Sequence, residues 1–309
     1  MTVLFHENQL NLRGTSVALY DYAHYNETVL GNVSYIAAPR NSDLSALEKF
    51  VNRFGDRVML YTDFNTLVLD INKITKVDTA YFIKYGINDG LLFPGVKNIV
   101  HYVFDGSQPH GDHYLGVSEW LSEKYNTDYL PHIVSMPDID YSYRDFLNIP
   151  KDSTVFGRYG GADQFDVGYL REAVEAAANL GVYFLFMNTN VFTNEHNNIK
   201  YINPTYDLES KAAFINTCDA MIHGRVEGET FGLSICEFLY YDKPIVTNIE
   251  GKDKNHIRLL KDKGYYYSSV NELYSILVNF KKGGFGGRSL VKKYESTHVM
   301  NKFKLLVNG

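Results

Sequence analysis

The sequence predicts an α/β protein of two domains, each built on a mostly parallel sheet with helices on both faces. Short runs rich in β-branched and aromatic residues alternate with amphipathic helical stretches along the chain, and parallel sheets require this order. The length of 309 residues suits two separate cores. Residues 136–152, with two prolines and several acidic side chains, interrupt the alternation and are interpreted as the interdomain connection.

The first half of the chain begins with a strand over residues 2–5. A helix over 16–29 follows, for which Ser16 is the expected N-cap. After a strand over 33–37, the apolar residues of 43–54 keep helical spacing and predict a second helix. The series continues with elements at 57–61, 65–74, 79–84, 98–104 and 129–135.

The second half restarts with a strand over 154–156 and a helix over 166–180, which Gly181 closes at its C′ position. We therefore expect an N-terminal domain over 1–145, a C-terminal domain over 146–288, and a C-terminal helix within 289–309 that packs back on the first domain. The other elements expected in this half are strands at 182–187, 199–202, 220–223, 244–247 and 265–267 and helices at 208–217, 232–241, 255–263, 270–280 and 290–307.

Composition excludes several classes of protein. Hydrophobic residues at 45% and charged residues at 21% are typical of a globular chain and not of a disordered one. No apolar run approaches the roughly 20 residues of a membrane helix, and the N-terminus does not resemble a signal peptide. A net charge of −6 argues against a nucleic-acid partner. Two cysteines cannot form a disulfide framework, which favours a reducing, cytoplasmic location.

The most informative stretch is 219–237, DAMIHGRVEGETFGLSICE, which reads as strand, polar loop and helix start. Its backbone N–H groups at the helix start suit an anion such as a pyrophosphate. Carboxylates accept hydrogen bonds from sugar hydroxyls, so Glu229 suits a bound hexose and Glu237 a ribose. The spacing therefore indicates a sugar nucleotide. The alternative is a solvated glutamate before a helix and a second one on its polar face.

This segment resembles the Glu-x7-Glu motif of retaining GT-B glycosyltransferases of the GT4 type, the glycosyltransferase group 1 family, with Glu229 and Glu237 as its ends. Val155-Phe-Gly-Arg158 resembles the family's strand after the linker, and 243–247 the strand after the motif. The resemblance is strong over 147–280 and concerns mostly the layout over 1–146. It implies two Rossmann-like domains with parallel sheets facing a central cleft. It also implies hexose transfer from a nucleotide diphosphate sugar to an acceptor hydroxyl, with retention of configuration.

By the same resemblance, Arg158 contacts the donor diphosphate and takes up leaving-group charge, and neither a bound metal nor a cofactor is needed. The family's second diphosphate contact, a lysine a few residues after this arginine, is missing from 159–166. We hypothesise that Arg225 supplies the missing charge, a surface ion pair being the alternative. The donor-binding residues implied are Arg158, Glu229, Thr230, Phe231, Gly232, Leu233 and Glu237.

In the first domain, Arg13-Gly14-Thr15 places a cation, a glycine and a hydroxyl at a helix start. Family position assigns Arg13 and Gly14 to the donor phosphates, an ordinary capped turn being the alternative. Asp105 and His110, in the loop after a strand, are candidates to contact or deprotonate the acceptor hydroxyl, or else stabilise that loop. His110-Gly-Asp112 matches part of an iron triad, but that triad belongs to a β-helix, which the alternating pattern contradicts.

Asn203-Pro204-Thr205 follows a strand and resembles the loop that contacts the nucleobase in the family. The expected partners are a UDP- or GDP-sugar donor and a glycan, lipid-linked or protein-linked acceptor, with peripheral membrane contact as an option. These expectations place the chain in glycan biosynthesis. Two alternatives are a non-catalytic GT-B remnant that binds a sugar nucleotide or glycan, and a dinucleotide-dependent oxidoreductase. The second lacks the Gly-x-Gly-x-x-Gly pattern it requires.

Overall fold

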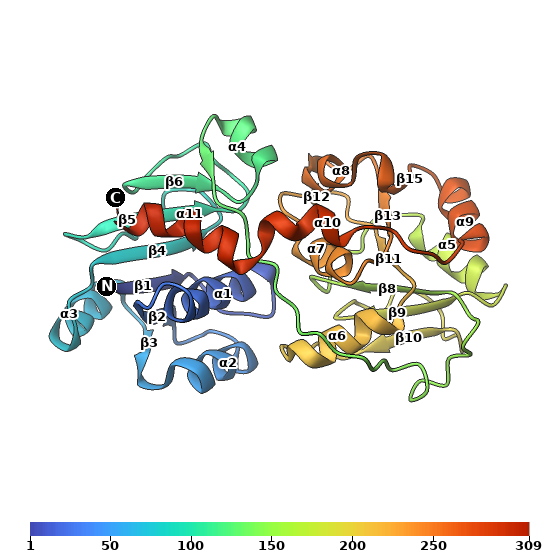
Figure 1. Cartoon of the computed structure of the whole chain (residues 1–309), viewed down its shortest axis with the longest axis horizontal. Helices are drawn as coiled ribbons and strands as arrows, with labels where there is room; N and C mark the ends of the chain where they lie inside the picture. The colour runs from blue at the N-terminus through green and yellow to red at the C-terminus, as the bar shows by residue number, and fades with distance from the viewer. Residues whose placement is uncertain (309) are drawn as a thin grey trace. The chain divides into compact units, whose positions relative to one another are not determined.

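The structure is a computed structural model that describes residues 1–308, and it divides into two compact units (Figure 1). Unit 1 comprises Met1–Ile133 together with the C-terminal segment that begins at Lys293. Unit 2 comprises Val134–Lys292. Each unit contains one large parallel sheet, as the alternating sequence pattern predicts.

The sheet of unit 1 is entirely parallel and has the strand order β3-β2-β1-β4-β5-β6-β7. Its strands are β1 (Thr2–Glu7), β2 (Val33–Pro39), β3 (Val58–Tyr61), β4 (Thr79–Lys84), β5 (Lys97–Tyr102), β6 (His113–Gly116) and β7 (Asp128–Tyr129). The helical elements are α1 (Gly14–Thr28), α2 (Leu44–Phe54), η1 (Gly55–Arg57), α3 (Phe64–Ile74), α4 (Glu119–Tyr125), η3 (Lys292–Tyr294) and α11 (Ser296–Asn308).

Alternation along the strands decides which helices cover which face of this sheet. Leu4 and Phe82 point to one face, where they form a core with the apolar side of α3. Their neighbours Phe5 and Tyr81 point to the other face. There both rings contact Phe303 of α11. The single helix expected over 290–307 is instead divided into α10, the 3-10 turn η3 and α11. The C-terminal segment is thus part of the core of unit 1.

The six-stranded sheet of unit 2 is also parallel, with the order β10-β9-β8-β11-β13-β15. Its strands are β8 (Val155–Tyr159), β9 (Tyr183–Met187), β10 (Ile199–Ile202), β11 (Ala220–His223), β13 (Ile245–Asn248) and β15 (Tyr265–Tyr267), beside a small pair β12 (Gly228–Glu229) and β14 (Asp253–Lys254). The helical elements are α5 (Leu170–Ala178), α6 (Leu208–Thr217), α7 (Leu233–Tyr240), α8 (Asn255–Leu260), η2 (Lys261–Lys263), α9 (Val270–Asn279) and α10 (Arg288–Val291).

Helices cover both faces of this second sheet too. Phe156 points to the face that packs against α5 and α9. Its neighbour Gly157 points to the face of α6 and α7, where an added Cβ would lie 2.2 Å from Cys218 Sγ. Tyr159, on the same face, packs against Phe214 and Phe238. Glycine at 157 therefore allows α6 and α7 to approach the sheet closely.

Both sheets contain a topological switch point, a pair of neighbouring strands at which the strand order reverses because the connections run to opposite sides of the sheet. In unit 2 it lies between β8 and β11, and in unit 1 between β1 and β4. Ligands of open α/β sheets bind outside the carboxyl ends of the strands at such points. The residues that end these strands are therefore the first candidates for a site: Tyr159 and His223 in unit 2, Glu7 and Lys84 in unit 1.

The structure corrects several boundaries expected from the sequence. Unit 1 ends at Ile133 and not after residue 145, because the following segment is tied to unit 2, for example by the Arg144–Asp219 ion pair at 2.8 Å. The second boundary falls after residue 292 and not after 288. Ser16 is not an N-cap: α1 begins earlier, at Gly14.

A further correction concerns the far edge of the unit 1 sheet. The strand expected over 129–135 is paired only at Asp128–Tyr129, because the preceding strand offers it only Leu115 and Gly116 as partners. The sequence prediction also missed that preceding strand, β6, and the helix α4 after it. Both elements are short, so their residue patterns carry little periodic signal.

Candidate functional site

Arg158 is a buried cation at the carboxyl edge of the unit 2 sheet, and its side chain bonds only to neutral oxygens. Its Nη1 donates to the Asn188 carbonyl at 3.2 Å and to Thr189 Oγ1 at 2.6 Å, and its Nη2 donates to the Gly161 carbonyl at 2.7 Å. No carboxylate of the described residues forms an ion pair with it, although the residue is only 3% exposed. Guanidinium carries five N–H groups, so two remain for a ligand.

The charge of Arg158 persists at neutral pH. Burial lowers the pKa of Arg158 to about 10, which still leaves the guanidinium protonated. The negative charge of Glu229 raises the pKa of Arg158, and the positive charge of Arg225 lowers it. The three charged groups are therefore close enough to interact. Because a buried, uncompensated charge is costly, an anionic ligand would be stabilised beside it.

Glu229 is placed by the small pair β12–β14, and the glycine before it makes this pairing possible. Gly228 has φ of +70°, and a Cβ there would lie 2.1 Å from the Asp253 carbonyl oxygen. The two strands can therefore approach only when residue 228 has no side chain. Glu229, the next residue, lies opposite Lys254 where β12 pairs with β14, and the short segment after it leads into α7.

The Glu229 carboxylate is held by two donors, and its side chain is 16% exposed. His223 Nε2 lies 3.1 Å from Oε1 and Arg225 Nη1 lies 3.2 Å from Oε2. Burial alone would raise the pKa of Glu229, but the hydrogen bond from His223 and the charge of Arg225 outweigh it and hold the pKa at about 2. The His223 ring is fixed from its other side by Thr247 Oγ1, 2.8 Å from Nδ1. Glu229 is thus an ionised, oriented acceptor.

Arg225, hypothesised to supply the missing positive charge, lies beside Glu229. Its guanidinium forms an ion pair with Glu229, and the side chain is 13% exposed. Much of its charge is therefore compensated within the protein. Arg158 has no ion-pair partner of this kind. Its guanidinium is therefore the group here that is best able to bind an anion.

The N-terminus of α7 follows Glu229 directly. Gly232 occupies the N-cap position in the left-handed region, with φ of +85°, and no side chain caps the helix. Phe231 is buried, and its carbonyl accepts a hydrogen bond from Asn255 Nδ2 at 2.8 Å, which fixes the backbone just before the helix. Thr230 is buried beside it, whereas Leu233 is half-buried. Backbone N–H groups of the first helical turn favour an anion at this point.

Glu237 lies inside α7 and is buried, at 3% exposure. The Tyr159 hydroxyl donates to its Oε2, and Lys211 Nζ lies 3.3 Å from its Oε1. The carboxylate therefore already has one protein donor on each oxygen. Tyr159, which bonds to Glu237, and Arg158 are consecutive residues of β8.

The loop 203–205, predicted to contact a nucleobase, follows β10 at the edge of the same sheet. Asn203 and Pro204 are exposed, and Thr205 Oγ1 accepts a hydrogen bond from the Asp207 backbone at 3.0 Å. The loop thus lies at the carboxyl end of β10, and its first two side chains are exposed.

In unit 1, Arg13 and Gly14 are exposed at the start of α1. Arg13 is the N-cap residue but makes no side-chain cap, and its backbone N–H donates to Asn11 Oδ1 at 2.8 Å. Glu7 at the end of β1 is linked to the first turn of α1, because its Oε2 accepts a hydrogen bond from Ser16 Oγ at 2.6 Å.

Asp105 and His110 follow β5, and the structure gives each an internal partner. Asp105 accepts a hydrogen bond from the Ser107 backbone, and hydrogen bonds from Ser107 lower the pKa of Asp105. His110 Nδ1 lies 2.7 Å from the Gln108 carbonyl, and its Nε2 lies 3.3 Å from Lys84 Nζ.

The nearest neighbour of this loop is Lys84, at the switch point of unit 1. Its ammonium is buried against the Asp89 carboxylate at 2.5 Å and the Leu91 carbonyl at 2.7 Å. Asp112, the other half of the His-x-Asp pattern, accepts from the Asn98 backbone instead. Among residues 1–308, no group of three or more His, Cys, Asp or Glu side chains is arranged to hold a metal ion.

Sequence reasoning missed several residues of these networks, among them Tyr159, Lys211, His223 and Glu7. Tyr159 and His223 end the two strands that flank the switch point, so strand order would have indicated them. Lys211 has no such signal, because it lies in a helix whose exposed face also carries charged residues. Only the packing of α6 against the sheet shows that its side chain is buried.

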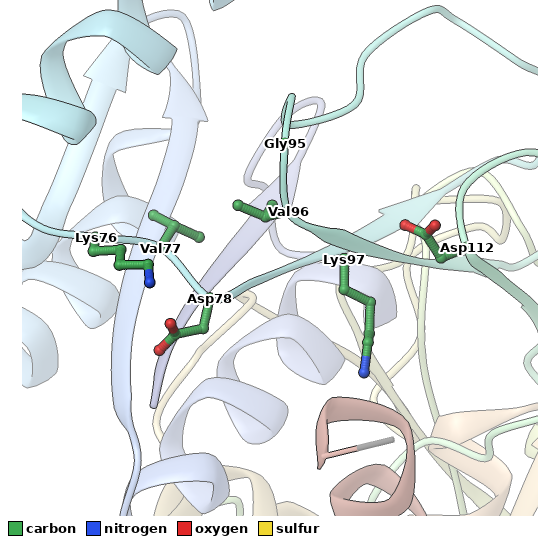
Figure 2. A pocket seen from close by; sticks show the side chains of 7 residues that line it. All are labelled: Lys76, Val77, Asp78, Gly95, Val96, Lys97 and Asp112. Atoms are coloured by element: carbon green, nitrogen blue, oxygen red, sulfur yellow. The ribbon is translucent and has the colours of Figure 1, made fainter.

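A shallow hollow of about 550 Å³ lies at the opposite edge of the unit 1 sheet (Figure 2). Its lining residues precede β4, β5 and β6, so it opens at the amino ends of the strands. Three of its charged side chains have protein partners: Asp78 accepts from the Thr2 backbone, Asp112 from the Asn98 backbone, and Lys97 donates to the carbonyl of Leu306. The hollow is therefore a poor candidate for the site.

Comparison with known proteins identifies the fold. No family model and no curated protein sequence matches this chain. Among solved structures, Anabaena HepE in complex with UDP-glucose has a TM-score of 0.75 at 13% identity, over 100% of this chain and 99% of that one. A glycosyltransferase from Rickettsia africae has 0.69 at 13%, over 99% and 97%. Sucrose-phosphate synthase from Thermosynechococcus elongatus has 0.70 at 12%, over 100% and 98%.

These similarities extend over the full length of both partners, and they establish that the chain has the GT-B fold, with two Rossmann-like α/β units. The fold class expected from the sequence is thereby confirmed. A separate property can be read from the helices: within the part of the chain that the structure describes, none has the length and apolar character needed to cross a bilayer.

Proposed function

We propose that this protein is a glycosyltransferase that moves a hexose from a nucleotide diphosphate sugar to an acceptor hydroxyl, with retention of configuration and without a bound metal. The observation that carries the proposal is Arg158, a buried guanidinium with only neutral partners, in the neighbourhood of an oriented carboxylate, Glu229. A sugar diphosphate offers the matching groups, an anion for the cation and hydroxyls for the carboxylate. The GT-B neighbours, one of which is in complex with UDP-glucose, support this choice of ligand.

In this proposal, unit 2 binds the donor. Arg158 and the first backbone N–H groups of α7, from Gly232 and Leu233 onward, stabilise the charge that develops on the diphosphate as the glycosidic bond breaks. Glu229 accepts hydrogen bonds from the sugar hydroxyls, and its pKa of about 2 keeps it an acceptor at any physiological pH. Glu237 accepts the ribose hydroxyls. The backbone at Thr230 and Phe231 and the loop 203–205 complete the sugar and base contacts.

Unit 1 is assigned to the acceptor, with Asp105 and His110 as candidate contacts and Arg13 and Gly14 as candidate phosphate contacts. The lowered pKa of Asp105 makes its carboxylate a weaker base, better suited to binding a hydroxyl than to removing its proton. The departing diphosphate is then the base in this proposal. The acceptor is a glycan or a lipid-linked or protein-linked hydroxyl.

The proposal is tested first by binding. The melting temperature is measured with UDP, GDP, dTDP and their hexose conjugates, in the wild type and in Arg158→Gln. A bound diphosphate raises the melting temperature of the wild type, and the variant loses most of that rise because its guanidinium is gone. Arg171→Gln, on the exposed face of α5, is the matched control and keeps the full response. Failure of every nucleotide to stabilise the wild type would refute the proposal.

Turnover separates an enzyme from a non-catalytic remnant. Hydrolysis of the stabilising sugar nucleotide is followed by NMR, which also reports the anomeric configuration of the released sugar. Glu229→Ala should mainly lower the rate, whereas Glu237→Ala should mainly weaken nucleotide binding. A wild-type protein that binds a sugar nucleotide yet neither hydrolyses it nor transfers it to any tested acceptor would favour the remnant.

A further inference from the structure

Two loops at the carboxyl end of the unit 1 sheet present apolar side chains to solvent. Tyr85, directly after β4, is 59% exposed, and Ile87 in the same loop is 49% exposed. Phe104, in the loop after β5, is half-buried, and its ring centroid lies 5.2 Å from that of Tyr85. One exposed apolar residue is ordinary, whereas several at the ligand-binding end of a parallel sheet indicate a contact surface. We call Tyr85, Ile87 and Phe104 the aromatic platform.

Hydrogen bonds fix the backbone beneath the aromatic platform. The Tyr85 carbonyl accepts from the backbone N–H groups of Phe104 and Asp105, both at 3.0 Å. The Tyr114 hydroxyl lies 2.6 Å from the Gly86 carbonyl oxygen and 3.0 Å from that of Asp105. Gly86 has φ of +133°, and a Cβ there would lie 1.6 Å from the Asp105 carbonyl oxygen, so only glycine allows the two loops to approach. The exposed rings are therefore carried on a preorganised support.

Side-chain contacts at the base of the Tyr85 loop add to this support. The buried ammonium of Lys84 lies 2.5 Å from Asp89 Oδ1, and Asn8, which follows β1, donates to Asp89 Oδ2 at 2.9 Å. The Asn88 backbone N–H donates to Gln108 Oε1 at 3.0 Å, which joins the loop after β4 to the loop after β5 a second time. Because both loops are tied together and to the end of β1, a ligand would not have to order them.

The polar groups of the two loops suit hydroxyls better than charged ligands. Residues 85–96 and 103–112 contain no lysine or arginine. The exposed or half-buried side chains there that can bond to hydroxyls include Asn88, Asp105, Ser107 and Gln108. Lys84 is paired with Asp89, and Lys124 of α4 acts on Asp105, whose pKa is lowered first by hydrogen bonds from Ser107 and in part by this charge. An anionic bilayer or a phosphorylated ligand needs a cluster of cations, which neither loop provides.

We propose that the aromatic platform binds the acceptor and that the group it recognises is an uncharged sugar. One face of a pyranose ring carries C–H groups that pack on an aromatic ring, and its edge carries hydroxyls that amides and carboxylates bind. The inference rests on the proposed function, because it names the class of acceptor for the same reaction. The acceptor hydroxyl then belongs to a sugar and not to a lipid or an amino-acid side chain.

The first experiment measures sugar binding by saturation-transfer NMR. The probes are the methyl glycosides of glucose, galactose, mannose and N-acetylglucosamine, together with lactose and cellobiose. At least one probe should bind the wild type, and Tyr85→Ala should weaken that binding by roughly 10-fold, because the stacked ring is lost. Tyr85→Phe keeps the ring and should keep the binding. Phe146→Ala, which removes a ring of unit 2 that is 83% exposed, is the matched control and should behave as the wild type.

The second experiment follows transfer to the bound probe, with the stabilising sugar nucleotide as donor. Tyr85→Ala should raise the KM for the probe by roughly 10-fold and leave the KM for the donor unchanged, because the donor is assigned to unit 2. The inference is overturned if no neutral sugar binds, if no bound sugar is glycosylated, or if Tyr85→Ala equals the wild type. Tyr85-dependent binding to phosphatidylglycerol vesicles without sugar binding would also overturn it. A wild type that binds no sugar nucleotide would instead refute the proposed function itself.

Discussion

Replacing Glu7 by glutamine removes a carboxyl group that the fold of unit 1 keeps protonated up to about pH 7. Glu7 ends β1, is 6% exposed, and accepts a hydrogen bond from Ser16 Oγ at 2.6 Å. No cation of the described residues forms an ion pair with it, since the nearby Lys84 is bound to Asp89. Burial raises the pKa of Glu7 from its usual 4.5 to about 7, and the hydroxyl hydrogen bonds offset only part of that rise.

The size and sign of the effect follow from these two pKa values. Below pH 4.5 the carboxyl is protonated in both the folded and the unfolded chain. Between pH 4.5 and 7 the unfolded chain releases this proton while the folded chain retains it, so the free energy of unfolding falls as the pH rises. A difference of about 2.5 in pKa is worth about 3 kcal/mol at ~1.4 kcal/mol per tenfold change in proton affinity. Glutamine has no such dependence.

The assay is urea unfolding of the wild type and Glu7→Gln at pH 4 and pH 8. Fluorescence of Trp120, the single tryptophan, reports on unit 1 because it lies in α4. The stability of Glu7→Gln relative to the wild type should rise by up to about 3 kcal/mol between pH 4 and 8. Glu27→Gln is the control of opposite sign, because Arg53 and Arg57 lower the pKa of Glu27. Parallel pH profiles for the wild type and Glu7→Gln would refute the reasoning.

Four other substitutions test the site and the fold. Arg158→Ala should weaken UDP binding by at least 10-fold in calorimetry, since it removes a buried guanidinium that bonds only to neutral oxygens. Arg225→Ala should reduce turnover more than UDP affinity, because its charge is paired with Glu229; unchanged turnover and affinity would remove it from the site. Gly228→Ala should lower the melting temperature by several degrees, as its Cβ meets a carbonyl at 2.1 Å. Phe303→Ala should destabilise unit 1 by roughly 3–5 kcal/mol in urea unfolding, and a change below 1 kcal/mol would contradict the packing of α11.

The sequence predicts most of the helices and strands of this fold because their patterns are local. Helical spacing in 44–54 and an aspartate N-cap before it define α2 with no reference to the rest of the chain. Gly181, with φ of +89°, follows the C-cap residue Asn179 of α5 by two positions, so it lies one residue beyond the C′ position expected for it. The short elements β6 and α4 were missed for the same reason, since a few residues cannot display a period.

The assembly of the candidate site was only partly predictable. The spacing from Glu229 to Glu237 and the strand that carries Arg158 are visible in the sequence. In the structure Arg158 lies near the carboxyl end of β8, Glu229 lies before α7 and Glu237 lies inside that helix. The partners of these residues are not visible, because Asn188, Lys211 and Thr189 reach them from distant parts of the chain.

The sequence by itself determined the alternating parallel architecture and a pair of glutamates around a helix start, because periodicity and turn residues act over a few positions. The tertiary structure decided which charges are compensated. Arg225 and Lys211 each neutralise one glutamate, whereas Arg158 is left with neutral oxygens alone. Charge compensation depends on distances of a few ångströms between residues far apart in the chain, and only the folding of β8, α6 and α7 around one sheet sets those distances.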